Sequence, residues 1–262
     1  MAVVHVFSFE NVVAADYEAL RPDYAPEAIA WVIQRAGLGP GSLVVDLAAG
    51  TGQLSRRLAP LGVDILAVEP ARNMRSIIEA RLPAVRTSGA SAEALPLDNG
   101  EADAVVVGNA FHHFNEQKAF AEIRRVLRTG GALALFWSGT ADSVYSSFPT
   151  LREIEDAVER TCASDSKVSA MVAAFRRWLD PPGDTVGFTP FERAEFPITQ
   201  VLPSARLADL YATSTDVASL PEDLRTGLLA HVRKLSARLP TLVELQRRSV
   251  VDLCFREPDP DD

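Results

Sequence analysis

The sequence predicts an α/β fold: a Rossmann-like open sheet, mostly parallel, with helices on both faces and a helical cap. Short apolar runs alternate with helical patterns through the first half of the chain, which is the order that right-handed βαβ units impose on a parallel sheet. One of these runs, Ala104–Val107, is apolar at every position, as expected for a strand buried on both faces. After Trp137 the alternation stops and helical spacing takes over, and this change predicts the cap.

The first half of the chain is predicted to supply five strands and the helices between them. The strands are expected at Ser42–Leu47, Val63–Val68, Ala84–Thr87, Ala104–Val107 and Ala132–Trp137. The helices are expected at Glu27–Arg35 and Gln53–Leu58, and helical spacing recurs through Met74–Ile78 and Phe120–Leu127. The pair Gly130-Gly131 is interpreted as a structural turn into the fifth strand.

The second half is predicted to be mostly helical, with two late strands. Helical patterns cover residues 142–180, Ser204–Ala212 and Glu222–Leu239. Phe191–Phe196 and Val250–Phe255 have strand character, and we expect them to form an antiparallel pair at the sheet edge. Three regions follow: a ligand-binding α/β core over 1–137, a helical cap with one late strand over 138–249, and a final edge strand with an acidic tail over 250–262.

Composition and charge narrow the class of protein. Of the 262 residues, 47% are apolar and 23% are charged, and the formal net charge is −9. Such a chain can build a packed core, which excludes wholesale disorder. The acidic balance argues against nucleic acid as a partner, because phosphate binding needs clustered Lys and Arg. Cys162 and Cys254 lack metal-ligand spacing, so we interpret them as free thiols in a reducing compartment and expect no metal site.

The sequence also predicts a cytoplasmic protein without a membrane partner. Met1–Val13 contains no Lys or Arg, so it lacks the charged start of a secretory signal. The longest uncharged candidate span, Thr129–Ala141, has 13 residues, fewer than the roughly 18 that a bilayer requires. The few lysines and the abundance of Ala and Arg favour a bacterial source. A monomer and a homodimer both remain open.

The first strand-to-helix turn is the expected ligand site, because open α/β sheets bind ligands beyond the carboxyl ends of their strands. Asp46 closes the strand, and small residues follow at Ala48, Gly50 and Gly52. They allow a ligand to lie against the backbone. The third glycine of a dinucleotide fingerprint is replaced by Ser55, and the carboxylate of Asp46 would repel a pyrophosphate. A ligand with a positive charge fits better.

A second acid, Glu69, closes the next strand 23 residues after Asp46. That placement suits hydrogen bonds to the two hydroxyls of a ribose. Adenosine with a cationic, amino-acid-like end is S-adenosylmethionine. The sequence here resembles the class I S-adenosylmethionine-dependent methyltransferases, specifically the small-molecule branch that includes ubiquinone/menaquinone-type and trans-aconitate-type enzymes.

Several further segments carry the resemblance. Val44–Gly52 resembles the family's first motif, with Ala48 in place of its usual first glycine, and Ala67–Pro70 resembles its ribose-binding loop. Ser91–Leu97 resembles the adenine loop, where the family often has Asp at the position of Ser91. Asn109–Phe114 is similar to the segment after the fourth strand, and the N-terminal Asp16-Tyr17 and Arg21-Pro22 are similar to a lid segment.

The resemblance implies methyl transfer from S-adenosylmethionine to a small-molecule acceptor. It implies a cofactor site formed by Tyr17, Arg21, Asp46, Ala48, Gly50, Gly52, Glu69, Pro70, Ser91, Ala92, Glu93 and Asn109. His112 and His113 follow the fourth strand at the same sheet edge, so either could act as a base or orient the acceptor. One could instead cap the next helix while the other packs in the core.

Three other functions stay open at this point. An NAD(P)-dependent oxidoreductase uses a similar sheet, but Asp46 and the missing third glycine argue against it. A cyclase could bind S-adenosylmethionine without transferring its methyl group. A nucleic-acid methyltransferase would need a base pocket of the Asn/Asp-Pro-Pro-Tyr type, which the sequence lacks.

Overall fold

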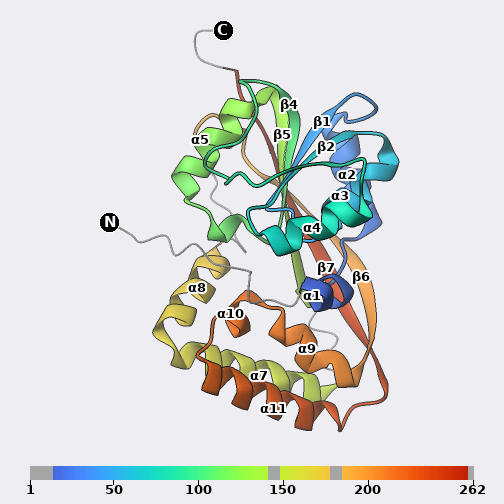
Figure 1. Ribbon diagram of the computed structural model, residues 1–262, viewed down its shortest axis with the longest axis vertical. Coiled ribbons are helices and arrows are strands. Elements are labelled where there is room, and N and C mark those ends of the chain that lie inside the picture. Colours follow the sequence, from blue (N-terminus) through green and yellow to red (C-terminus); the bar gives the residue numbers. More distant parts are fainter. Residues whose placement is uncertain (1–13, 141–147, 178–184, 259–262) are drawn as a thin grey trace.

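The computed structural model describes residues 14–140, 148–177 and 185–258. A seven-stranded sheet in the order β3-β2-β1-β4-β5-β7-β6 runs through the molecule, with helices on both faces and further helices gathered at one end (Figure 1). The strands are β1 Leu43–Leu47, β2 Asp64–Val68, β3 Arg86–Ser88, β4 Ala102–Gly108, β5 Leu127–Thr140, β6 Glu192–Pro203 and β7 Leu242–Phe255. The α-helices are α1 Ala14–Leu20, α2 Pro26–Ala36, α3 Gln53–Leu58, α4 Arg72–Arg81, α5 Glu116–Val126, α7 Pro149–Ser164, α8 Ser166–Arg177, α9 Leu207–Ala212, α10 Thr215–Ala218 and α11 Glu222–Ser236. Short 3₁₀ helices are η2 Ala59–Leu61, η3 Phe111–His113 and η4 Ser204–Arg206.

The pairing of the strands confirms the predicted fold class. Strands β1 to β5 pair in parallel, whereas β7 pairs antiparallel with both β5 and β6. The late strands therefore form the expected antiparallel pair at the sheet edge. The order of the strands reverses between β1 and β4, and this switch point is where open α/β sheets place ligands.

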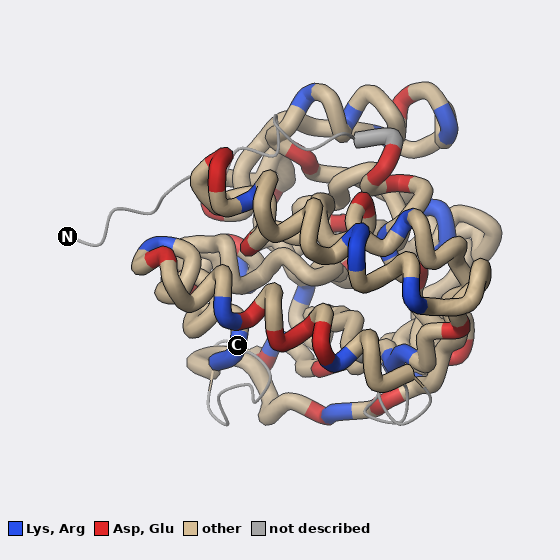
Figure 2. The backbone as a smooth tube through the Cα atoms, turned by 90° about the horizontal axis from the view of Figure 1, so that it is seen from below, with Lys and Arg blue, Asp and Glu red and all other residues tan. Residues whose placement is uncertain are grey.

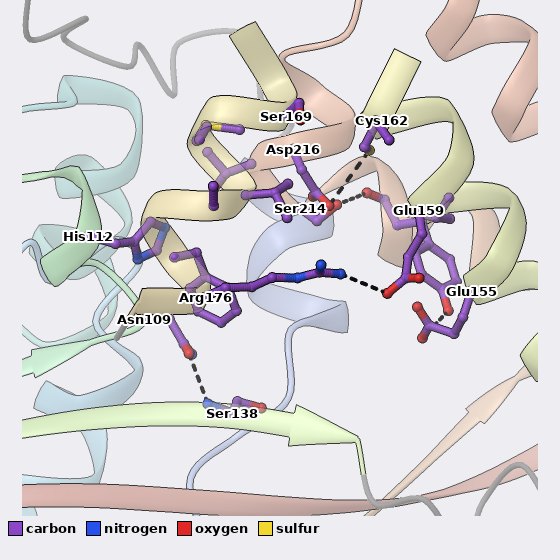
Figure 3. A pocket seen from close by; sticks show the side chains of 18 of the residues that line it. Asn109, His112, Ser138, Glu155, Glu159, Cys162, Ser169, Arg176, Ser214 and Asp216 are labelled. Carbon is purple, nitrogen blue, oxygen red and sulfur yellow. Dashed lines mark hydrogen bonds and ion pairs between the residues drawn. The ribbon is translucent and has the colours of Figure 1, made fainter. Parts of the chain in front are cut away.

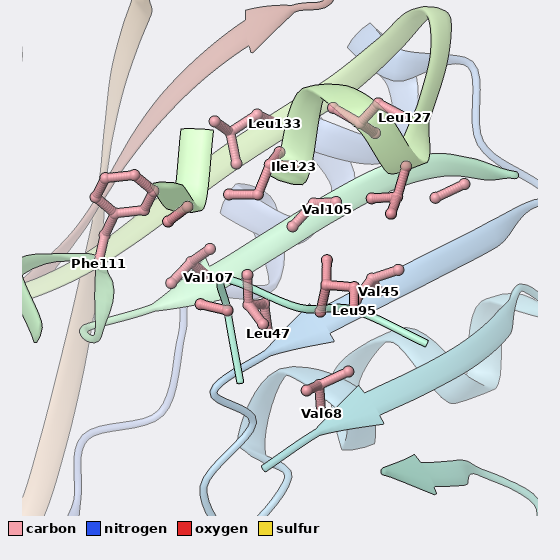
Figure 4. Packing of buried hydrophobic residues seen from close by; sticks show 14 of the residues in the cluster. Val45, Leu47, Val68, Leu95, Val105, Val107, Phe111, Ile123, Leu127 and Leu133 are labelled. Atoms are coloured by element: carbon pink, nitrogen blue, oxygen red, sulfur yellow. The ribbon is translucent and has the colours of Figure 1, made fainter. Parts of the chain in front are cut away.

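Apolar residues cover both faces of the parallel strands. On one face, Ile123 of α5 packs with Val105 of β4 and Leu133 of β5, all three fully buried (Figure 4). On the other face, Ile29 and Val32 of α2 pack with the same sheet. Each fully buried side chain of this size stabilises the fold by about 1.5–3 kcal/mol. These two layers hold the strand ends, and hence the switch point, in fixed positions.

The late strands are longer than the sequence pattern predicted. β6 and β7 contain 12 and 14 residues, and their outer halves leave the core and enter the cap. There Leu202 and Val243 pack with Leu207 and Val232 of the cap helices. The predicted boundary at residue 249 therefore falls inside β7. The sequence pattern did not show the full length of β6, because exposed side chains recur along the whole strand.

Gly130-Gly131 lies inside β5 and does not form the predicted turn. The register between β4 and β5 shifts there, since Ala102 pairs with Leu127 whereas Ala104 pairs with Ala132. Such a shift is a β-bulge. A Cβ on Gly131 would come within 2.8 Å of the Arg128 carbonyl oxygen, so the backbone approach at this bulge requires glycine.

Candidate active site

Asp46 is the second-last residue of β1, at the switch point, and is 1% exposed. Its Oδ2 accepts hydrogen bonds from the Ser55 backbone N–H (2.9 Å) and hydroxyl (2.6 Å). Within the described part of the chain, Oδ1 is buried and has no hydrogen-bond partner. Burial raises the pKa of Asp46 to about 6, against the lowering effect of the Ser55 hydrogen bonds. Ser55, which replaces the third glycine of a dinucleotide fingerprint, thus holds the Asp46 carboxylate in place. The Asp46 Oδ1 stays able to accept a hydrogen bond from a cationic donor.

The glycine turn after β1 adopts left-handed backbone angles. Ala48, Gly50 and Gly52 have φ values of 55°, 57° and 86°, a region that costs an L-residue about 1–2 kcal/mol. A Cβ built on Gly50 would meet nothing closer than a Tyr17 ring carbon at 3.9 Å and the Met74 Sδ at 4.0 Å. The structure therefore leaves open backbone at Gly50, as a closely bound ligand requires. Ala48 therefore adopts a left-handed conformation at an energetic cost that a glycine at this position would not have.

Glu69 directly follows β2 beside this turn and is 5% exposed. Its Oε2 accepts from the Gly50 N–H and its Oε1 from the Ala71 N–H, each at 2.8 Å. Burial raises the pKa of Glu69 despite these two hydrogen bonds. Each carboxylate oxygen keeps a lone pair, so hydroxyl donors can still bind. The following Pro70 is exposed, and its carbonyl oxygen accepts from Arg75.

The loop Ser91–Leu97 passes beside this edge of the sheet. Ala92 is buried in the core cluster, and Glu93 accepts a hydrogen bond from the Asn115 N–H (3.0 Å) at the start of α5. Ser91 is exposed. Of the three predicted adenine-contacting side chains, Ser91 is the one left facing solvent, while Glu93 holds the loop to a helix.

Helix α1 lies between the core and the cap (Figure 1), and it was not among the helices that the sequence predicted. The Arg21 guanidinium lies 5.1 Å from the centre of the Tyr17 ring and donates to the Thr213 carbonyl oxygen at the end of α9 (2.9 Å). Glu18, with 4% side-chain exposure, accepts from Arg81 of α4 (2.7 Å). The helix that carries the predicted lid residues is thus attached to the core and to the cap.

Asn109 follows β4 with a φ of 52°. Its Oδ1 accepts from the Ser138 N–H (2.9 Å) and its Nδ2 donates to the Tyr24 hydroxyl (3.0 Å). Asparagine tolerates this left-handed conformation better than most residues. The side chain therefore joins the end of β4 to β5 and to the segment before α2, which gives Asn109 a structural role at the edge of the predicted site.

His112 and His113 lie side by side in η3, with ring centres 3.9 Å apart. The ring of Phe175 from α8 packs edge-on against His112 at 5.0 Å. Burial lowers the pKa of His112 to about 3, with further contributions from His113 and Arg21, and lowers that of His113 to about 4. Both imidazoles are therefore neutral at pH 7 and are weak proton acceptors.

A buried charged group supports these rings, and the sequence analysis missed it. Asp252 of β7 is fully buried; it accepts from the Trp137 indole N–H (3.0 Å) and from two nitrogens of Arg193 (2.7 and 3.0 Å). The Trp137 ring lies 6.0 Å from that of His112. A signal was present in the sequence, because Asp252 is the one acid within the apolar run Val250–Phe255.

A cavity of about 520 Å³ lies between the strand ends and the cap. Asn109, His112 and Ser138 lie at its core end, and residues of α7 to α10 form most of the remainder (Figure 3). Arg21, whose charge acts on His112, also lines it. The cap side chains are Glu155, Val158, Glu159, Cys162, Ala163, Ser169, Met171, Val172, Ala173, Phe175, Arg176, Leu210, Tyr211, Ser214, Thr215 and Asp216, with Pro22 and Arg247 completing the wall. The sequence predicted a helical cap in this region but none of these cap residues individually.

The acidic residues of the cavity all come from the cap. Glu155 accepts from the Tyr211 hydroxyl (2.7 Å), and burial raises the pKa of Glu155. Glu159 pairs with Arg176 at 3.1 Å. Burial, with a smaller effect of Asp216, raises the pKa of the Cys162 thiol to about 12, so this cysteine is not a nucleophile at neutral pH. In the described ranges no group of His, Cys, Asp and Glu is arranged to hold a metal ion, and no helix is long and apolar enough to cross a membrane.

Comparison with known proteins agrees with this geometry. Residues 45–135 match the family described as "Methyltransferase domain". An uncharacterized methyltransferase of Mycobacterium tuberculosis is 35% identical over 255 residues, covering 95% of this chain and 94% of that protein. The demethylmenaquinone methyltransferase of Renibacterium salmoninarum is 30% identical over 155 residues, covering 57% of this chain and 65% of the enzyme.

A solved structure from Anaeromyxobacter dehalogenans, provisionally described as a type II methyltransferase, has the same fold. It superposes with a TM-score of 0.64 at 22% identity, covering 90% of this chain and 97% of that one. The family is not one of nicotinamide-dependent oxidoreductases, and the match to the mycobacterial relative spans nearly the full length of the chain. The chain therefore belongs to the class I methyltransferases, which use S-adenosylmethionine as their cofactor.

Proposed function

We propose that the protein transfers the methyl group of S-adenosylmethionine to a small molecule held between the core and the cap. The cavity of about 520 Å³ carries this proposal, because its volume falls within the roughly 300–1,000 Å³ typical of small-molecule sites. Its core end lies at the carboxyl ends of β4 and β5, next to the glycine turn. An acceptor bound there lies beside the predicted cofactor site.

The residues at the switch point fit the cofactor. The buried, unpartnered Oδ1 of Asp46 can accept from the amino group of its methionine part, and the free lone pairs of Glu69 can accept from the ribose. The full proposed set is Tyr17, Arg21, Asp46, Ala48, Gly50, Gly52, Glu69, Pro70, Ser91, Ala92, Glu93 and Asn109. When bound, the cofactor supplies an activated methyl group on a sulfonium sulfur, so the protein's main task is to align the acceptor.

His112 and His113 serve this alignment in our proposal. A general base works best when its pKa lies near the operating pH, and burial lowers the pKa of each histidine to about 4 or below. Neutral imidazoles can still donate or accept hydrogen bonds. Their low pKa values favour orientation of the acceptor over removal of its proton.

The distribution of charge supports a small acceptor rather than a nucleic acid. Acidic and basic residues are interspersed over the described chain (Figure 2), whereas a nucleic-acid site concentrates Lys and Arg on one face. We propose a protein of the cytoplasm that acts as a monomer or a homodimer.

Calorimetry with S-adenosylhomocysteine tests the cofactor site. We expect Asp46→Ala and Glu69→Ala each to weaken binding at least tenfold, because each removes a buried carboxylate from the proposed contacts. The exposed Asp64, at the start of β2, provides a control: Asp64→Ala should bind normally. Unchanged affinity in both site variants would contradict the assignment. Formation of S-adenosylhomocysteine during turnover, with a methylated product, would exclude a non-methylating cyclase.

A further inference from the structure

Three side chains at the core end of the cavity carry buried polar atoms without a hydrogen-bond partner. Among residues 14–140, 148–177 and 185–258, the Arg21 Nε, the His112 Nδ1 and the Ser138 Oγ have no partner, and all three residues line the cavity. A buried polar atom left unpaired costs about 1–3 kcal/mol. Such a group of atoms at one end of a cavity indicates that a bound molecule completes it.

The chemistry of these atoms indicates what kind of group that is. An arginine Nε–H can only donate, and a serine hydroxyl and a neutral imidazole can also donate. Their common partner is a group rich in lone pairs, and donors of this kind bind ionised oxygen most strongly. Among the described residues that line the cavity, the carboxylates are Glu155, Glu159 and Asp216, which belong to α7 and α10 and not to this end.

The electrostatics of this end also favour a negative group. Burial, the neighbouring imidazole and the Arg21 guanidinium disfavour a positive charge on His112. The same surroundings disfavour an ammonium group, or the positive nitrogen that forms when a neutral amine is methylated. The other arginines that line the cavity are Arg176 of α8 and Arg247 of β7. Both are positively charged and therefore do not offset the charge of Arg21. Burial disfavours a charge of either sign, so it is the positive charge of Arg21 that favours an anionic oxygen over an ammonium group at this end.

Resting on the proposed function, we infer that the acceptor presents an ionised oxygen, of a phenol, enol or carboxylic acid, to Arg21, His112 and Ser138. Because His112 is a weak base, the acceptor loses its proton to solvent before transfer. An oxygen lone pair then forms the new O–C bond to the methyl carbon while the C–S bond breaks and its electron pair stays on sulfur. The three unpaired atoms are buried in residues that line the cavity, so the inference requires these side chains to turn toward the bound oxygen.

The test measures how the site ionises a probe. We would titrate 4-nitrophenol bound to the protein saturated with S-adenosylhomocysteine, following the phenolate absorbance. The pKa of bound 4-nitrophenol should fall by about one unit, the equivalent of a tenfold preference for the anion. Calorimetry with benzoate, benzyl alcohol and benzylamine should show benzoate binding about tenfold more tightly than either other probe. The phenol and benzoate arms distinguish an acidic hydroxyl from a carboxylate.

Variants separate the proposed contacts from general effects. Ser138→Ala and His112→Leu should each reduce the preference for the anion about tenfold, since hydrogen bonds to charged groups have that strength. His112→Asn keeps an N–H donor, so it should retain part of the preference for the anion that His112→Leu loses. Two residues of α11 provide controls: the buried Ser236, which donates to the Val232 carbonyl oxygen, and the exposed His231. Ser236→Ala and His231→Asn should leave the preference unchanged.

Contrary results are distinguishable from failure of the proposed function. Tighter binding of benzylamine, an unshifted 4-nitrophenol pKa, or no binding of either anion would overturn the inference. So would a loss of S-adenosylhomocysteine affinity in Ser138→Ala with the anion preference intact, because the cofactor's own carboxylate would then be the partner. Failure of the wild-type protein to bind S-adenosylhomocysteine would instead refute the cofactor site.

Discussion

Replacing Asp252 with alanine tests the buried support behind the aromatic wall of the cavity. The substitution removes two hydrogen bonds from Arg193 and one from the Trp137 indole and leaves both donors beside an apolar strand. Breaking a buried pair by removing one partner costs about 3–5 kcal/mol. Because the Arg193 side chain is 32% exposed, it can regain some hydration, so we expect the lower end, about 3 kcal/mol.

Urea unfolding followed by tryptophan fluorescence measures this loss. Trp137→Phe keeps a ring and removes only the indole donor, so it should cost about 1 kcal/mol. Because Asp252→Ala already removes that hydrogen bond, the double variant should lose less than the sum of the two single losses. A loss below 1 kcal/mol in Asp252→Ala, or strict additivity, would show that the network does not stabilise the fold as inferred. Asp252→Asn, which keeps an acceptor oxygen, should lie between wild type and alanine.

Three further predictions concern the switch point and its neighbours. Ala48→Gly should stabilise the protein by about 0.5–1 kcal/mol, because relief of left-handed strain exceeds the entropy that glycine adds to the unfolded chain; a lower thermal midpoint would contradict this. The folded-state pKa of His112 lies near 3, below the ordinary value of 6.5, so its contribution to stability is complete above pH 6.5 and is lost as pH falls toward 3, at up to about 1.4 kcal/mol per pH unit. His112→Phe should flatten that part of a pH–stability curve, and an unchanged slope would refute the shift. The pKa of Asp46 is instead raised to about 6 from 3.8, so its burial destabilises the fold progressively as pH rises between those values; Asp46→Asn should gain stability relative to wild type over that window, and a constant difference across it would exclude the shift.

The sequence could predict the parallel half of the fold because its signals are local. Each strand is a short apolar run, and each turn, such as Asp46–Gly52, brings its polar residues to the same sheet edge. The cap gave no comparable signal. Helices α7 to α11 bury one side and expose the other, which shows where a helix lies but not which residues face a shared cavity. Glu155 and Asp216 are 61 positions apart in sequence, and only the packing of α7 against α10 brings them to one wall.

Other differences have equally specific causes. The sequence suggested that one of the two histidines could be a base, because free histidine titrates near pH 6.5. Burial beside Phe175 and the charge of Arg21 change that property, and neither is visible in the local sequence. Residues 14–20, which the sequence analysis compared only with a lid segment, form a helix whose acidic side chains bind arginines of other elements. Contacts between residues far apart in the sequence set both the pKa of His112 and the position of α1, and a local sequence pattern does not show such contacts.

Arg21 connects the two parts of the proposed site. It packs on Tyr17, whose ring lies beside the open backbone of Gly50, it donates to Thr213 in the cap, and it lines the cavity next to His112. A ligand at the glycine turn and a ligand in the cavity would therefore meet two side chains that contact each other, Tyr17 and Arg21. We expect occupation of the cavity to change the affinity for S-adenosylhomocysteine, and equal calorimetric affinities with and without a cavity ligand would contradict this coupling.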